Sequence, residues 1–170
     1  MGSTLSADVF YGFNLGYGED IDDDEMPEWW QNDEEWQEVL ATRLGWVEVP
    51  HPTHLYPPEC EDHRTSYEER ERMRAEVRKT PEFQAWSDSR DELHALVSSV
   101  GVEIDHYGWE YGASAVRVKA SVRTFYSAVD VLKPLVVGED WADRVTRFCE
   151  LLELPIPDDG PSWSLNCSYG

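Results

Sequence analysis

Acidic residues are concentrated near the start of the chain, in the segment YGEDIDDDEMPEWWQNDEEWQEVL at residues 17–40. Eleven of these 24 residues are Asp or Glu, three are Trp, and none is Lys or Arg. Carboxylates at this density have two chemical uses. They can bind hard cations, or they can form charge-assisted hydrogen bonds to the lysines and arginines of another molecule.

The acidic loop does not follow the pattern of a calcium-binding EF-hand. Such a loop needs acids at positions 1, 3 and 5, Gly at position 6 and Glu at position 12. Counted from Asp20, position 6 is Glu25 and position 12 is Gln31, so the turn residue and the last ligand are both missing. A weak, generic Ca²⁺ or Mg²⁺ site remains an alternative, and a solvated acidic loop is the simpler interpretation.

A second set of candidate ligands lies in the Pro-rich segment 46–64. Its H-x₂-H-x₅-C-x₂-H spacing matches no zinc finger or ribbon, and the four prolines of the segment exclude a long regular element. A metal-binding protein or enzyme using this loop is one alternative, and a packed Pro-rich loop is the other. The candidate zinc ligands are His51, His54, Cys60 and His63.

Other catalytic signatures are missing from the sequence. It contains no G-x-S-x-G, no P-loop and no G-x-G-x-x-G. None of the three cysteines lies in the local motif of an activated thiol. We therefore expect a protein that acts by binding rather than by catalysis, and that needs no cofactor.

Length and composition favour one folded domain over residues 1–170. The chain has 8 Trp, 8 Tyr and 5 Phe, too many large apolar side chains for a disordered acidic tail. It has no apolar run of membrane-spanning length, and its first residues lack the basic and apolar regions of a signal peptide. Three sparse cysteines argue against a disulfide framework, so we expect a reducing, cytoplasmic location.

The first quarter of the chain predicts a strand, a loop and a helix. Residues 7–16 alternate in polarity as a strand does, and an acidic loop follows at 17–26. Pro27 suits the first position of a helix that would extend to about residue 44. One face of that helix would carry Trp29, Trp36, Leu40 and Leu44, and the other Glu34, Glu35 and Glu38. Asp33 falls on the tryptophan face, which suggests a later start.

The remaining elements predict an α+β domain. It would be a small antiparallel or mixed sheet of about four strands packed with three to four helices. Glu103 and Asp105 on the first strand of a hairpin would face the basic residues of the second, which are Arg117, Lys119 and Arg123. The expected elements are a helix after the Ser66–Glu69 capping box, a helix from Thr80-Pro81 to Gly101, a hairpin over 101–126 around Gly112, a helix over 141–152 and a strand over 161–170.

Charge restricts the class of partner. The chain has 35 acidic and 14 basic residues, a formal net charge of −21, and residues 1–42 contribute −12 of it. Neither DNA nor an anionic membrane is expected to bind such a protein directly. Preorganised carboxylates can instead occupy the lysines and arginines with which another protein grips phosphate.

In size and charge the chain resembles DNA-mimic inhibitors of restriction or CRISPR-type defence, which phages and mobile elements encode. That resemblance implies a partner that binds nucleic acid, such as a nuclease or a defence complex. An immunity protein against a basic nuclease toxin would use the same physics, and charge that serves only solubility is a third alternative. The predicted contact residues are Glu19, Asp20, Asp22, Asp23, Asp24, Glu25, Trp30, Glu34, Glu35 and Glu38.

Overall fold

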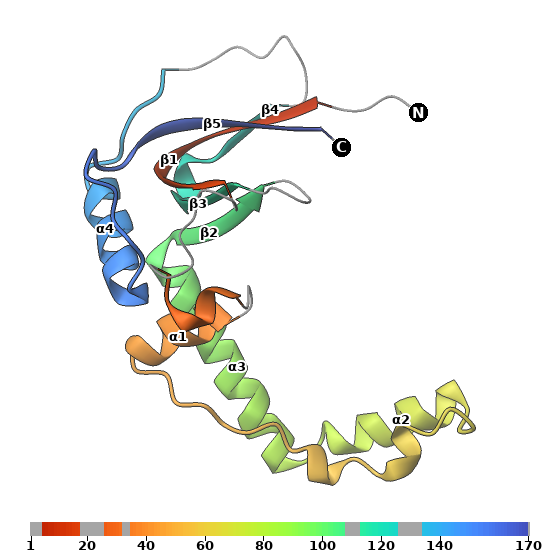
Figure 1. Cartoon of the computed structure of the whole chain (residues 1–170). Coiled ribbons are helices and arrows are strands. Elements are labelled where there is room, and N and C mark those ends of the chain that lie inside the picture. The colour runs from red at the N-terminus through yellow and green to blue at the C-terminus, as the bar shows by residue number, and fades with distance from the viewer. Residues whose placement is uncertain (1–4, 18–25, 32–34, 108–112, 126–133, 170) are drawn as a thin grey trace. The chain divides into compact units, whose positions relative to one another are not determined.

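The first strand of the chain organises the sheet. In this computed structural model, which describes residues 5–17, 26–31, 35–107, 113–125 and 134–169, β1 (Leu5–Tyr17) pairs antiparallel with three other strands (Figure 1). The sheet order is β2-β3-β1-β4, and β5 also pairs with β1. These strands are β2 (Val102–Tyr107), β3 (Ala113–Val118), β4 (Arg123–Phe125) and β5 (Ser162–Tyr169).

The described residues also form four α-helices, which confirms the predicted α+β class. Five strands are present where about four were expected, and all their pairings are antiparallel. The helices are α1 (Glu35–Arg43), α2 (Tyr67–Val77), α3 (Pro81–Val100) and α4 (Trp141–Leu152). None of these helices is both long and apolar enough to cross a membrane.

Two compact units divide the chain. Residues 1–40 and 98–170 make up the sheet unit, and residues 41–97 make up the helical unit. The expected single domain over residues 1–170 stays a prediction.

The core of the sheet unit lies between the sheet and α4. Phe13 on β1 pairs in register with Val116 on β3, which pairs with Ile104 on β2, so the three side chains share one face. The apolar row of α4 packs against these strands (Figure 1), and its Phe148 and Leu152 are fully buried. The amphipathic pattern predicted for residues 141–152 thus defines the buried side of the helix.

The predicted long strand after Gly112 is wrong in one respect, because it is interrupted. A 3₁₀ turn at Lys119–Ser121 separates β3 from β4, and β4 pairs with β1 rather than with β2. Buried Ser121 stabilises the break: its Oγ accepts from the Tyr11 N–H at 2.9 Å and donates to the Val118 carbonyl at 2.6 Å. The side chain therefore replaces ladder hydrogen bonds that the turn removes.

The predicted helix over 27–44 is also corrected. Residues Glu28–Gln31 form a 3₁₀ turn, and the α-helix begins only at Glu35. Trp36 and Leu40 are buried as predicted, but Leu44 lies in the turn after α1 and is 37% exposed. The acid that did not fit the tryptophan face, Asp33, lies outside the described residues.

In the helical unit, side-chain caps start two helices as the sequence predicts. The Ser66 Oγ accepts from the Glu69 N–H at 3.3 Å before α2, and the Thr80 Oγ1 accepts from the Phe83 N–H at 3.3 Å before α3. The Trp46 indole donates to the Ser89 carbonyl at 2.8 Å. Segment 46–64 has no long element, as predicted, and holds short 3₁₀ turns at Thr53–Leu55 and Pro58–Cys60.

Candidate functional site

The structure describes only part of the predicted contact surface. Glu38 is exposed on α1, and Glu35 is the first residue of that helix. On the opposite side of α1, the buried Trp36 ring meets the Phe148 ring of α4 edge to face, with centroids 5.7 Å apart. This contact packs Trp36 into the core of the sheet unit, whereas the Glu38 side chain is exposed. The other predicted acids, Glu19, Asp20, Asp22, Asp23, Asp24, Glu25 and Glu34, lie outside the described residues.

Trp30 is more enclosed than an isolated surface anchor. Its ring is half-buried and lies edge to face with Trp29, at 5.7 Å, and with His106 of β2, at 5.8 Å. Trp29 in turn donates its indole N–H to the Leu152 carbonyl at 3.2 Å. The 3₁₀ turn at Glu28–Gln31 brings the Trp29 and Trp30 rings together. In an α-helix, the side chains of two consecutive residues would point about 100° apart. The role of Trp30 in partner contact stays a prediction.

Charge is unequally divided between the two units. The sheet unit has 23 acidic and 6 basic residues, a formal charge of −17, and the helical unit has 12 and 8, a formal −4. Bases of the sheet unit are engaged internally: Arg144 pairs with Asp140 at 2.8 Å, and Arg147 with Glu150 at 3.3 Å. The acidic excess of this unit therefore has few cations within the chain to neutralise it.

An acidic group around α4 was missed by sequence reasoning. These acids occur singly or in adjacent pairs separated by apolar residues and arginines, so no long run of like charge marks them. Residues 139–159 hold seven acids and two bases, a formal −5. The α4 acidic group, all of it exposed, is Glu139, Asp140, Asp143, Glu150, Glu153, Asp158 and Asp159.

Arg117 on β3 is the centre of an ion-pair cluster on the other face of the sheet. Its Nε donates to Glu103 Oε1 at 2.8 Å, and its Nη1 pairs with Asp105 and, at 3.6 Å, with Asp8 Oδ2. Only 13% of the Arg117 side chain is exposed. The predicted cross-strand pairing of Glu103 and Asp105 with a base is confirmed, and Asp8 is an additional partner. Three carboxylates thus share one largely buried guanidinium, so loss of Arg117 would leave three like charges close together.

The proposed zinc ligands do not converge. Among the described residues, which include all four candidates, no group of three or more His, Cys, Asp or Glu side chains is placed to hold a metal ion. The His51 ring stacks on Tyr56 with centroids 5.6 Å apart and meets Trp86 edge to face at 4.6 Å. Cys60 is buried, whereas His54 and His63 are exposed. The zinc alternative therefore has no geometric support in this loop.

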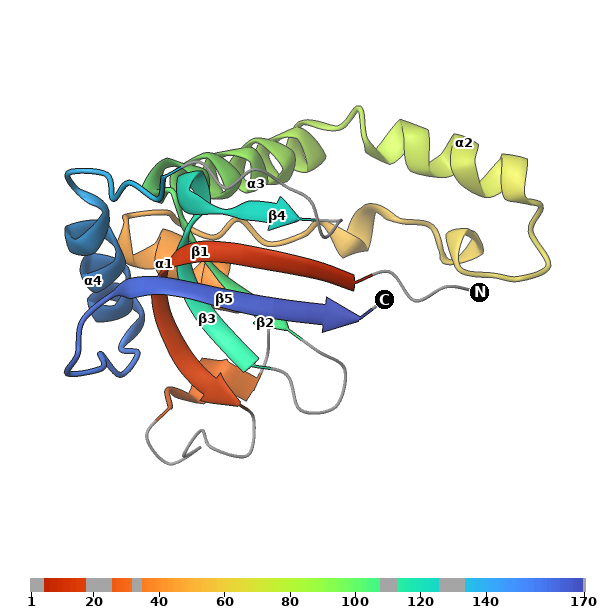
Figure 2. The same ribbon diagram turned by 90° about the horizontal axis from the view of Figure 1, so that it is seen from above.

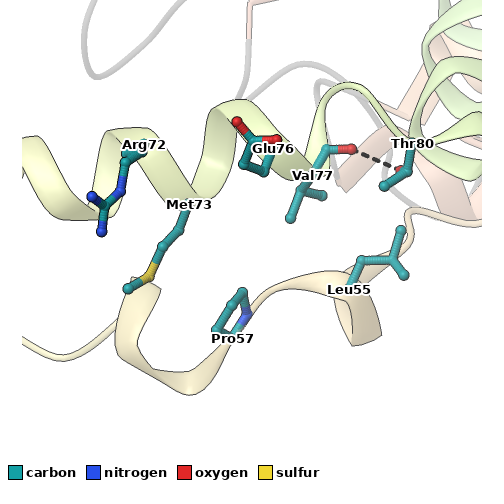
Figure 3. Close-up of a pocket in the computed structure, with 7 residues that line it drawn as sticks. All are labelled: Leu55, Pro57, Arg72, Met73, Glu76, Val77 and Thr80. Carbon is teal, nitrogen blue, oxygen red and sulfur yellow. Dashed lines mark hydrogen bonds between the residues drawn. The ribbon is translucent and has the colours of Figure 1, made fainter.

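An apolar groove of about 400 Å³ lies in the helical unit, between α2 and the Pro-rich loop (Figure 3). The polar groups of its lining are already engaged. The Thr80 hydroxyl donates to the Val77 carbonyl at 2.7 Å, Arg72 pairs with Glu69 at 3.7 Å, and Glu76 pairs with Lys79 at 2.7 Å. Such a groove suits apolar contact and offers no nucleophile with a base. Its lining is Leu55, Pro57, Arg72, Met73, Glu76, Val77 and Thr80.

The three cysteines differ in exposure, which makes their reactivity predictable. Cys60 and Cys149 are buried, and Cys167 on β5 is exposed. Burial raises the pKa of Cys149 to about 12, because the thiolate would lose its hydration in the core under α4. Since the thiolate is the reactive form, Cys149 stays unreactive in the native protein at ordinary pH.

We therefore expect a single fast-reacting thiol when native protein meets a disulfide reagent at pH 8, and all three thiols to react in denaturant. The Cys167→Ser variant should lose the fast phase completely, whereas Cys60→Ser should keep it. The release of the reagent's chromophore measures both. A fast phase of full amplitude in Cys167→Ser would contradict the assigned exposures.

Comparison of the chain with protein-family models, with curated proteins and with solved structures found no match, so its function has to be argued from its own residues.

Proposed function

We propose that this protein binds the basic, nucleic-acid-binding surface of another protein and inhibits it by presenting carboxylates in place of phosphates. One observation carries the proposal: residues 1–40 of the sheet unit hold 12 acids and no base, a formal −12 of the chain's −21. Charge that served only solubility would have no reason to gather in one segment. A basic partner supplies the cations that the sheet unit lacks.

The physics of the contact follows from the charge density of DNA. A duplex carries one negative charge per roughly 1.7 Å of its axis, so an imitation needs many carboxylates held close together. Residues 17–40 supply 11 acids without a single base. The α1 helix, anchored by Trp36, carries the last of these, Glu38, on its exposed side. The α4 acidic group adds further exposed carboxylates, of which Asp143 and Glu150 lie on α4 itself.

The partner in this proposal is a nuclease or a defence complex that binds nucleic acid in the cytoplasm. Its lysines and arginines would exchange phosphate for carboxylate in charge-assisted hydrogen bonds. Association would be fast and would weaken with salt, because opposite net charges steer the encounter. No catalytic step is required, so the protein would inhibit in proportion to its concentration.

Charge reversal tests the proposal. Lysine at Asp22, Asp23, Asp24, Glu34 and Glu35 should weaken partner binding by about a hundredfold, since each hydrated ion pair that is lost contributes roughly 0.2–1 kcal/mol. Pull-down from a bacterial lysate at low salt identifies the partner, and titration calorimetry with that partner measures the loss. The captured protein should bind nucleic acid, be displaced by duplex DNA, and dissociate at about 0.5 M salt, where the Debye length is roughly 4 Å.

The matched control reverses the same amount of charge in the helical unit. Lysine at the exposed acids Glu48, Glu61, Asp88, Asp91 and Glu92 should leave the affinity within about threefold of wild type. Circular dichroism should show both variants folded. Equal affinity of the two variants for the captured partner, or a partner indifferent to duplex DNA, would refute mimicry.

A further inference from the structure

The last strand of the sheet, β5, lies along one edge. It pairs antiparallel with β1 from Leu5↔Tyr169 to Gly12↔Ser162, and in the described part of the chain β1 is its only partner strand. Figure 2 shows β5 beside β1, with β4 on the other side of β1. Eight residues, Ser162–Tyr169, form this strand. The backbone groups on its outer side therefore form a ladder edge long enough to receive another strand.

The sequence of β5 lacks the devices that usually protect an edge. Native edges are blunted by charged side chains, by proline, by bulges or by short length. The strand reads SWSLNCSY, with no charge and no proline, in a chain in which 29% of residues are charged. Its register with β1 runs without a bulge. The Leu165 side chain is 66% exposed although it is apolar. These features together indicate an edge kept open for pairing.

The two faces of β5 differ, which defines what a docking strand must carry. Trp163, Leu165 and Cys167 share one face, and Trp163 is held there by ring contacts to Tyr11, at 5.7 Å, and Trp141, at 6.0 Å. Ser162, Ser164 and Asn166 share the other face, which also holds Asp8 of β1. A complementary strand therefore alternates apolar side chains on the first face with polar or charged ones on the second.

Charge selects the occupant. A second copy of this chain would bring another formal −21 and repel the first. The sheet unit itself has a formal −17, and two exposed acids, Asp158 and Asp159, precede β5 closely in the chain. A strand with lysine or arginine at alternate positions is complementary in both pattern and charge.

We propose that β5 receives an extended basic segment of the partner as an additional strand, by β-augmentation. The inference rests on the proposed function in one respect, which is that the partner is basic. Main-chain hydrogen bonds to the β5 edge would provide affinity, and the alternation of apolar and basic side chains would provide specificity. The acidic surfaces would steer the partner, and β5 would set the register in which it docks.

A peptide tests the edge directly. The probe is an eight-residue peptide of alternating Lys and Val, blocked at both ends and labelled for fluorescence anisotropy. It should bind the wild-type chain, and the corresponding Glu-Val peptide should not. Hydrogen exchange should slow over residues 162–169 when the Lys-Val peptide is present. Protection located elsewhere, or equal binding of the two peptides, would overturn the proposal.

Two opposite charges at one exposed position separate docking on β5 from general attraction. Leu165→Lys should bind the Lys-Val peptide several-fold more weakly than Leu165→Glu. Residue 165 faces the valines of the docked peptide, where lysine protects an edge, and the peptide's lysines on the opposite face still lie within about one Debye length of its charge. Both variants lose the same apolar contact, so their difference reports charge at the edge. Val47→Lys, at a side chain that is 76% exposed in the helical unit, should match wild type. Equal affinities of the two Leu165 variants would exclude the edge as the docking site.

Two further outcomes distinguish this inference from the proposed function. If Leu165→Lys captures the cellular partner as well as wild type does, while the variant with lysine at the five acids Asp22, Asp23, Asp24, Glu34 and Glu35 does not, the edge is wrong and mimicry stands. If this charge-reversed variant binds fully and Leu165→Lys does not, mimicry is wrong and the edge stands. A wild-type dimer in light scattering that Leu165→Lys makes monomeric would overturn the basic-strand proposal in favour of a second copy.

Discussion

Replacing Arg117 by methionine should destabilise the protein by about 3–5 kcal/mol, because it removes the cation that three carboxylates share. Asp8, Glu103 and Asp105 would then face one another with side chains only 24–31% exposed. Lys119 would remain near Glu103, at 3.7 Å, and would compensate for one charge in part. Since small domains are stable by about 5–15 kcal/mol, the variant should unfold at a much lower urea concentration.

Removing the repulsion should rescue this variant. Adding Glu103→Gln and Asp105→Asn to Arg117→Met leaves one carboxylate in place of three, so the triple variant should regain about half of the lost free energy. High salt should reduce the loss of unfolding free energy in Arg117→Met, because it screens the repulsion between the carboxylates. Urea denaturation at low and high salt measures both effects. A triple variant less stable than Arg117→Met would show that packing of the arginine stem, rather than charge balance, explains the loss.

Gly12→Ala should cost about 3 kcal/mol or more, although it adds only one methyl group. A Cβ at residue 12 would lie 1.9 Å from the Val116 carbonyl oxygen and 2.9 Å from the Arg117 Cα. Both are backbone atoms of β3, which no rotamer change can move. Residue 12 pairs with Arg117 on one side and with Ser162 of β5 on the other, so β1 cannot shift without disturbing two ladders.

The same substitution at Gly160 is the control. Gly160 has a positive φ of 73° but nothing within 4 Å of an added Cβ, so alanine there meets only backbone strain of about 1–2 kcal/mol. Thermal or urea unfolding of Gly12→Ala and Gly160→Ala measures the free energy lost to the steric collision at residue 12 and to the backbone strain at residue 160. Equal losses at residues 12 and 160 would contradict the close approach of β1 and β3. Arg117→Met and Gly12→Ala should lose partner binding only in proportion to the fraction of protein that is unfolded. The charge-reversed variant, in contrast, should lose binding while it is folded.

Local signals predicted the boundaries of several elements. The Ser66 and Thr80 caps, and Gly101 with its positive φ of 69°, mark helix ends because each satisfies a geometric need of the helix terminus itself. Apolar periodicity predicted α4 and the buried side of α1 for an equally local reason. Even the pairing of Glu103 and Asp105 with Arg117 was accessible, since a hairpin brings nearby segments together in known register.

Errors arose where a distant partner replaced a local preference. Residues 119–121 alternate like a strand, yet they form a turn because Ser121 can supply hydrogen bonds to Tyr11 and Val118. The apolar spacing around Trp29 suggests one continuous helix, yet its indole bonds to Leu152 from a 3₁₀ turn. Tyr11 lies 110 residues from Ser121, and Leu152 lies 123 residues from Trp29. A local stretch of sequence therefore contains neither pair.

The sequence by itself determined the acidic character of the protein, the lack of bases in residues 1–42 and the alternating polarity of its strands, because these depend only on residue identity and short-range spacing. Tertiary structure alone decided which strand became an edge, that Asp8 joins the Arg117 cluster, and that the acids of α4 add to the sheet unit's excess charge. Strand order depends on closing long loops onto competing partners, and that choice is made by packing of the whole fold rather than by any one segment.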